Sequence, residues 1–401
     1  MLFVAVLSQL LVSCHAQSVT VPQDTPLRTG IEVLLSDTTY TYSGDFAIGG
    51  KRFAVVANQT SMVGNVHLVD TLVAITENNV LKIFCPEHGF RGTAEAGATV
   101  DNSVDSKTGI PIISLYGKNK KPTPEQLKDV HCVVFDLQDV GCRFYTYLST
   151  LHYVMEACAE NDVQLIVLDR PNPNGHYVDG PVLDTATCRS FVGMHPVPVV
   201  YGMTIGEYAK MINGEGWLKG GIKCDLTVIP MQGYKRDSVG YELPVPPSPN
   251  LRNAHAIALY PSLCLFEGTN VSVGRGTDRP FEIIGIPSQN STIGCDNSEF
   301  TIAGQKAPAK RFTPKGGNSY YGIDLRNIDV PAKFDLSYLM TMYGMAKKGT
   351  FFLKSNFFEK LAGNTELRKQ IEKGMSEEAI RASWQPALDE FKRTREKYLI
   401  Y

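Results

Sequence analysis

The sequence has almost no excess charge of either sign. Its 401 residues carry 39 lysines and arginines against 41 aspartates and glutamates, a formal net charge of −2. No stripe of basic residues interleaves with aromatic ones, so no nucleic-acid partner is expected. The short basic segment Gly117–Thr123 has the composition of a solvated loop. At 43% hydrophobic and 20% charged residues, the chain fits a soluble globular protein with two domains or one elaborated α/β unit.

Apolar runs of the length that crosses a membrane are also lacking. The run Leu2–Val12 is too short to span a bilayer and has the length of the apolar part of a signal peptide, although the usual preceding basic residues are missing. Cleavage after Ala16 would remove residues 1–16, whereas "LVSC" resembles a bacterial lipobox with Cys14 as the lipidated residue. Both interpretations predict an exported protein, secreted or periplasmic, and we favour them over a buried N-terminal strand.

Motifs for metals and cofactors are missing as well. There is no CxxC pair and no cysteine–histidine spacing typical of zinc, so no metal site is expected. The motifs GxGxxG after a strand, GxxxxGK[ST], GxSxG and HExxH are absent, which removes the usual support for dinucleotide, P-loop, serine-hydrolase and zincin activities. We therefore expect no cofactor. The cysteines, nine in all, leave two interpretations open, disulfides in an exported chain or small buried hydrophobic residues.

What the chain does have is a regular alternation of apolar strands and helices. Strands are predicted at residues 52–58, 80–85, 163–169 and 224–231, and the segment 131–141 begins as another. Helices with one apolar face are predicted at residues 66–79, 146–162 and 204–218. This pattern is typical of a parallel sheet covered on both faces, an α/β Rossmann-like domain.

A proline-dense connector, Tyr241–Asn250, gives the best domain boundary. We expect the Rossmann-like N-terminal domain at residues 20–245 and a smaller mixed α/β C-terminal domain at residues 246–401. The second domain ends in charged helical patterns at residues 335–348 and 386–401.

Polar side chains collect where the predicted strands end. The carboxyl ends of parallel strands share one edge of the sheet, and ligands bind there. The side chains expected to converge at this edge are Asn58, Glu87, His88, Arg91, Gln138, Asp139, Arg143, Asp169, Arg170 and Asn172. A second group lies in the glycine-punctuated segment Tyr260–Glu282, and it contains Glu267, Asn270 and Arg275.

Each of these residues also has a purely structural interpretation. Asp139 and Arg143 could pair and cap the following helix. Asp169 and Arg170 could stabilise a turn before Pro171. His88 could simply hold its loop. Glu87 is hardest to explain structurally, because it stands between Pro86 and His88 at a strand end with no helix face to solvate it.

Long segments in this order resemble one family, the exo-acting β-N-acetylmuramidases. They are "PEHGFRGTAEAG", "DSKTGIPIISLYGKNKKPTPEQL", "VVFDLQDVGCRFYTYLSTL", "LDRPNPNG" followed by "DGPVLD", "YGMTIGEYAKMINGEGWL", "PPSPN" and "YPSLCLFEGTNVSVGRGTDRPFE". The resemblance runs from about Gly30 to the C-terminus. Cys85 departs from it, because the family more often carries a small or apolar residue there.

The resemblance implies a cleft between the two domains and release of N-acetylmuramic acid from the non-reducing end of peptidoglycan fragments such as muropeptides or disaccharides. It also implies that the catalytic glutamate is Glu87. Glycoside cleavage needs a carboxylic acid and usually a second carboxylate, for which Asp139, Asp169 and Glu267 are available. We expect His88 to position Glu87. A cation should bind the lactyl carboxylate of muramic acid, with Arg275 favoured, then Arg143.

Two other functions stay open at this stage. The cleft could belong to a non-catalytic protein that binds sugar or peptidoglycan, which would release no muramic acid. A nucleotide-dependent enzyme on a Rossmann-like sheet is disfavoured by the missing glycine fingerprint and would show cofactor dependence.

Overall fold

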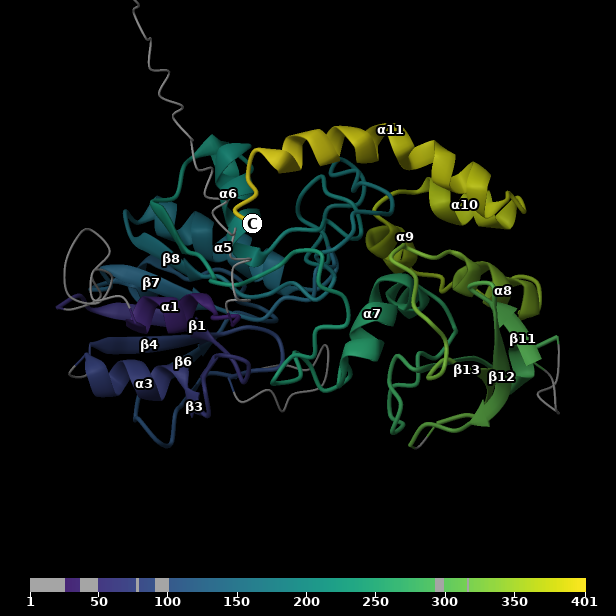
Figure 1. The fold of residues 1–401 in the computed structure, drawn as a ribbon, viewed down its shortest axis with the longest axis horizontal. Helices are drawn as coiled ribbons and strands as arrows, with labels where there is room; N and C mark the ends of the chain where they lie inside the picture. The colour runs from purple at the N-terminus through teal and green to yellow at the C-terminus, as the bar shows by residue number, and fades with distance from the viewer. Residues whose placement is uncertain (1–25, 37–49, 77–78, 91–100, 293–298, 316) are drawn as a thin grey trace, which may run out of the picture.

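The computed structural model describes residues 26–36, 50–76, 79–90, 101–292, 299–315 and 317–401 (Figure 1). The expected signal peptide and lipidation site therefore lie outside the described residues, as does Arg91. Among the described residues, no helix has both the length and the apolar character needed to cross a membrane.

The N-terminal domain is built on a seven-stranded sheet with the order β5-β6-β4-β1-β7-β8-β9. Six strands are parallel: β1 Phe53–Ala57, β4 Val80–Cys85, β6 Pro111–Ser114, β7 Cys132–Asp136, β8 Gln164–Leu168 and β9 Leu226–Ile229. The short edge strand β5 (Ser103–Val104) is antiparallel. A separate small hairpin pairs β2 (Met62–Val63) with β3 (Val66–His67). From β1 the chain first moves outward through β4 and β6, then returns to the other side of β1 and continues through β7, β8 and β9. This is the doubly wound order of a Rossmann-like sheet, as predicted.

Helices cover both faces of the sheet because its central strands are buried on both sides. In β1 the side chains of Phe53, Val55 and Ala57 point to one face, which α1 (Gly30–Ser36) and α3 (Leu68–Ile75) cover. Ala54 and Val56 point to the opposite face. That face is covered by two helices, α5 (Tyr147–Glu160) and α6 (Ile205–Gly214). Short helical turns α4 (Pro124–Leu127) and η1 (Lys219–Gly221) lie in the connections.

The C-terminal domain pairs a small antiparallel sheet with helices. Its sheet order is β10-β13-β12-β11. The strands are β10 Ile283–Pro287, β11 Glu299–Ile302, β12 Gln305–Phe312 and β13 Tyr320–Asp324. The helices are α7 Ala254–Leu263, η2 Cys264–Gly268, η3 Ser288–Asn290, α8 Ser337–Met345, α9 Phe357–Ala362, α10 Glu366–Glu372 and α11 Glu377–Glu396. The smaller mixed α/β second domain is thereby confirmed. The exact boundary at residue 245 stays a prediction.

The last helix differs from the prediction, which began it at Pro386. It begins after Ser376, whose side chain caps the backbone N–H of Ala379, and Pro386 lies inside the helix. Proline usually stands in the first turn of a helix, whereas Pro386 lies well inside this one. Figure 1 shows α11 running back across the molecule, so that the chain ends beside α6. There the Tyr401 hydroxyl donates to the Asp169 carboxylate at 2.9 Å.

Candidate active site

The end of β4 places Glu87 at the carboxyl edge of the sheet. His88 has φ 73° and Gly89 has φ 76°, so two successive residues are left-handed and the chain turns sharply there. Glycine accepts this conformation at no cost, but for histidine it is uncommon and is associated with functional sites. The turn leaves Glu87 half-buried and His88 buried beside it.

Two hydroxyl groups hold the Glu87 carboxyl group. Thr146 Oγ1 donates to Glu87 Oε2 at 2.7 Å. Thr146 is the N-cap of α5, but its side chain makes no cap hydrogen bond, so the hydroxyl is directed at Glu87. The second hydroxyl, from Tyr116 just after β6, also hydrogen-bonds to Glu87. Burial, together with the nearby charges of Glu87 and Glu267, raises the pKa of Tyr116, so this phenol remains a proton donor.

The opposite wall comes from the C-terminal domain. Glu267 in η2 forms an ion pair with Arg275, with 2.5 Å between Glu267 Oε1 and Arg275 Nη2. The guanidinium also lies over the Phe281 ring, 5.2 Å from its centroid. Because the pair is only partly buried, it fixes the direction of both side chains more than it stabilises the fold.

Between the two walls lies a cleft of about 560 Å³, a size typical of small-molecule sites. It is lined by Glu87, His88, Tyr116, Gly117, Lys120, Phe144, Tyr145, Thr146, Phe191, Val192, Ser248, Leu251, Tyr260, Cys264, Glu267, Arg275, Phe281, Phe357 and Leu361. Both domains contribute. The cleft therefore combines two carboxyl groups, two cations and several aromatic rings, which suits a polar ring such as a sugar.

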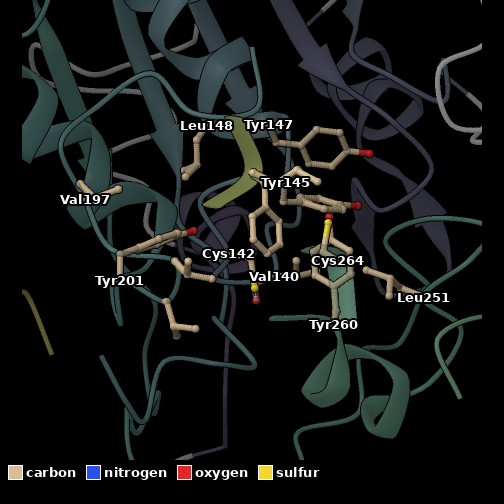
Figure 2. Packing of buried hydrophobic residues seen from close by; sticks show 14 of the residues in the cluster. Val140, Cys142, Tyr145, Tyr147, Leu148, Val197, Tyr201, Leu251, Tyr260 and Cys264 are labelled. Atoms are coloured by element: carbon tan, nitrogen blue, oxygen red, sulfur yellow. Dashed lines mark hydrogen bonds between the residues drawn. The ribbon is translucent and has the colours of Figure 1, made fainter. Parts of the chain in front are cut away.

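Aromatic side chains close the cleft where the domains meet. Figure 2 shows Tyr145 and Tyr260 packed together, with Cys264 beside them. The Tyr145 and Tyr260 ring centroids are 6.1 Å apart at 89°. The Tyr145 hydroxyl donates to the carbonyl of Pro247 in the connector at 2.8 Å. This packing joins the loop before α5 to α7, and it makes one wall of the cleft rigid.

Of the predicted site residues, the structure brings Glu87, His88, Glu267 and Arg275 together in the cleft. Eight others point elsewhere, so the expectation that all of them converge needs correction. Asn58 is fully buried and donates to the Tyr147 hydroxyl at 2.7 Å, behind Tyr145. Asn270 donates to the carbonyl of Thr350 at 2.6 Å.

The side chains that follow β7 are buried and form hydrogen bonds inside the N-terminal domain. Gln138 donates to the carbonyl of Pro171 at 2.6 Å. Asp139 accepts from the Tyr201 hydroxyl and from the backbone N–H of Gly141, and burial raises the pKa of Asp139 to about 6. Neither side chain lines the cleft.

Arg143 is also buried, and both terminal nitrogens of its guanidinium donate to main-chain oxygens. It donates to the carbonyls of Pro181 at 2.7 Å, Val197 at 2.8 Å and Leu361 at 2.8 Å. Leu361 belongs to α9, so this side chain ties the two domains together. Arg143 does not line the cleft in this structure, so its contacts do not support the prediction that it binds substrate.

The residues that follow β8 are likewise structural. Asp169 accepts from Thr204 Oγ1 at 2.7 Å as well as from Tyr401, and burial raises the pKa of Asp169 to about 6. Arg170 forms a bidentate ion pair with Asp136 at 2.5 and 2.8 Å. A third residue of this segment, Asn172, donates to the carbonyl of Met203 at 2.7 Å. The chain's own last residues thus occupy this part of the sheet edge.

Sequence reasoning missed several residues of the cleft. Thr146 and Tyr116 both follow strands, and the threonine before a helix was a visible N-cap signal. Lys120 lies in the basic segment that was interpreted as a solvated loop. Phe191 gave no signal, because it lies in an irregular segment far from any strand end.

The described residues contain no cluster of three or more histidine, cysteine or acidic side chains suited to a metal ion. Seven cysteines in the described part of the chain are free and buried: Cys85, Cys132, Cys142, Cys158, Cys188, Cys224 and Cys264. They behave as small hydrophobic residues there. Cys14 and Cys295 lie outside the described residues.

The fold and site define a two-domain α/β protein with a cleft that carries carboxyl groups from both domains. Two family models match the chain: the N-terminal domain of exo-beta-N-acetylmuramidase NamZ over residues 53–255 and its C-terminal domain over residues 258–401. The chain belongs to the NamZ family.

Relatives agree with this assignment. The chain is 42% identical over 391 residues to the peptidoglycan beta-N-acetylmuramidase NamZ of Bacillus subtilis (strain 168), covering 94% of this chain and 91% of that protein. Two crystal structures of DUF1343 family proteins from Bacteroides fragilis NCTC 9343 superpose with TM-scores of 0.78 and 0.79, at 43% and 29% identity. Each covers 94% of this chain and 99% of its own.

Proposed function

We propose that this protein is a glycosidase that releases terminal N-acetylmuramic acid from the non-reducing end of peptidoglycan fragments. The observation that carries the proposal is the placement of Glu87, held by two hydroxyls across a sugar-sized cleft from the Glu267–Arg275 pair. The similarity to the Bacillus subtilis muramidase supports the choice of sugar.

Glu87 acts as the general acid in this proposal. Thr146 donates to Oε2 and the Tyr116 hydroxyl also hydrogen-bonds to the carboxyl group, so both contacts orient Glu87 for proton transfer to the glycosidic oxygen. Protonation of that oxygen makes the leaving sugar an alcohol rather than an alkoxide, which lowers the barrier to C–O cleavage. His88, buried in its strained turn, positions the Glu87 backbone.

Glu267 supplies the second carboxylate. Its ion pair with Arg275 fixes its direction. A carboxylate in this place can stabilise positive charge at the sugar ring, activate water, or orient the N-acetyl group of the substrate for internal attack.

The test is product analysis with matched substrates. The purified protein should release N-acetylmuramic acid from a disaccharide with muramic acid at its non-reducing end, and act far less on the matching N-acetylglucosaminide. A protein that binds these fragments but releases no free sugar would instead be a binding protein using the same cleft.

We further propose that the protein is exported, secreted or periplasmic. The apolar segment Leu2–Val12, with its two possible processing sites, supports this. Mass spectrometry of the mature N-terminus tests it: a chain beginning at Gln17 indicates cleavage after Ala16, and one beginning at acylated Cys14 indicates a lipoprotein. A chain that begins at Met1 and stays inside the producing cell would contradict export.

A further inference from the structure

We propose that Lys120 selects muramic acid by binding a carboxylate on the lactyl arm of the substrate. The inference rests on the proposed function, because it assigns specificity within the same cleft. Muramic acid differs from glucosamine by a lactyl ether, which ends in a carboxylate or continues into a peptide that carries carboxylates of its own. The shared chemistry is an anion extending from one edge of the sugar ring.

The loop that carries Lys120 is fixed at both ends. At its start, Ser114 Oγ bonds to the backbone of Tyr116, and Gly117 turns the chain with φ 85°. At its end, Thr123 forms a capping box with α4. The loop therefore has a defined conformation beside the cleft, although its sequence alone indicates a solvated segment.

Two adjacent lysines in this loop make different contacts. Lys121 is held against α5 by ion pairs with Glu156 at 2.7 Å and Glu160 at 2.6 Å. Lys120 instead lies over the ring of Phe191, with its Nζ atom 4.6 Å from the ring centroid, and it lines the cleft. A cation–π contact orients the ammonium group and leaves its N–H donors available for an anion.

The ring beneath Lys120 is itself held in place. Phe191 stacks on Tyr153 at 6.3 Å and 16°, and its backbone carbonyl accepts from Ser149 Oγ at 2.6 Å. Tyr116, which bonds to Glu87, lies 5.9 Å from the same ring. Phe191 and Tyr116 thus link Lys120 to the Glu87 carboxyl group.

Of the two cations that line the cleft, Arg275 and Lys120, Lys120 is the better placed to bind an anion. Arg275 is paired with Glu267 at 2.5 Å, so part of its charge is already neutralised. Among the residues that the structure describes, no carboxylate forms an ion pair with Lys120. An anionic substrate entering beside Glu87 and Glu267 needs such a cation, and a lysine provides a compact charge for it.

The experiment compares Lys120→Met with Lys118→Met, which removes the same charge from an exposed position in the same loop. Three substrates with the same leaving group are used: an N-acetylmuramide, its peptide-extended form and the N-acetylglucosaminide. Losing a hydrogen bond to a charged group weakens binding roughly ten- to a hundredfold. Lys120→Met should therefore lower kcat/KM for an anionic substrate by that factor, mainly through KM. It should leave kcat/KM for the glucosaminide unchanged. Lys120→Arg, which keeps the positive charge, should restore much of the kcat/KM lost with the anionic substrates.

A loss with the simple muramide identifies the lactyl carboxylate as the partner, and a loss confined to the extended substrate identifies a peptide carboxylate. If Lys120→Met behaves like Lys118→Met on all three substrates, or lowers all three equally, the inference is wrong. A wild-type protein that cleaves none of them contradicts the proposed function instead. In that case calorimetric titration with free N-acetylmuramic acid and N-acetylglucosamine still decides the role of Lys120, because selective binding of the acid must weaken in Lys120→Met.

Discussion

At the scale of single residues, the site depends on hydroxyl groups that position a carboxyl group. Thr146 could cap α5 and instead donates to Glu87 at 2.7 Å. A helix start gives up a capping interaction worth about 1 kcal/mol in this arrangement. Such a local departure from the usual pattern is typical of functional sites, because the lost stability is offset elsewhere in the fold.

Thr146→Val keeps the shape of this side chain and removes the hydroxyl. Because a hydrogen bond to an ionisable carboxyl group is lost, we expect kcat on a muramic acid disaccharide to fall by about tenfold or more. Thr150→Val, a similar change one helical turn later, should leave kcat unaffected, since the Thr150 hydroxyl donates to the carbonyl of Thr146 and not to Glu87 in the part of the chain that the structure describes. A Thr146→Val enzyme with the kcat of the wild type would contradict this role.

Sequence reasoning located Glu87, His88, Glu267 and Arg275 but misplaced their neighbours. It correctly expected polar groups at strand ends, yet it could not show which of them meet main-chain atoms. Arg143 and Asp169 illustrate the limit, since their partners lie in α9 and at Tyr401, distant in the sequence. Only the packed chain reveals that these partners fill the space that a ligand would need.

At the scale of secondary-structure elements, the strands were predicted well because buried parallel strands are short apolar runs with sharp ends. The irregular segments were not predicted from the sequence, although one of them forms part of the cleft. The loop containing Phe191 is joined to α5 by a buried pair of histidines, with 2.9 Å between His152 Nδ1 and His195 Nε2. The His195 ring in turn contacts the Tyr208 hydroxyl of α6 at 3.1 Å.

This histidine pair predicts a loss of stability in acid. Burial lowers the pKa of His152 to about 4, and nearby Glu156 only partly opposes that effect. The unfolded chain binds this proton near pH 6.5, so the stability is fully present above that pH and is lost as the pH falls toward 4. We expect about 3 kcal/mol of unfolding free energy to be lost over this window.

Urea denaturation at several pH values measures the effect. His152→Gln should show a shallower loss of stability between pH 6.5 and 4 than the wild type. His131→Gln, at an exposed position, should follow the wild-type slope. An equal slope in all three proteins would show that His152 does not control the acid response.

At the scale of the whole molecule, the chain returns on itself to fix the relative position of its two domains. Helix α11 crosses back over the N-terminal domain (Figure 1), and Arg395 donates to the carbonyl of Gly202 at 2.8 Å. Arg143 makes a second tie, because its three carbonyl partners come from both domains. The cleft between the domains therefore has a defined width.

Arg143→Met tests this tie. Three buried carbonyls lose their donor, so we expect the free energy of unfolding to fall by about 3 kcal/mol or more. The ratio of activities on muramides and glucosaminides should not change, since Arg143 does not line the cleft. Thermal denaturation and the two activity assays measure both effects, with Arg52→Met, at a half-exposed side chain, as the control. A stable Arg143→Met protein with an altered activity ratio would return Arg143 to substrate binding.

The central claim is that Glu87 is the general acid of a muramidase, and Glu87→Gln tests it most directly. Glutamine keeps the shape of the side chain and can still accept from Thr146, but it has no carboxylic proton to give. The measurement is turnover of a disaccharide with an unactivated leaving group, beside denaturation and substrate-binding assays that establish an intact fold. Turnover should fall about 10²- to 10⁴-fold while folding and binding persist. A folded Glu87→Gln protein that releases N-acetylmuramic acid at nearly the wild-type rate would contradict the account and make Glu267 the next candidate.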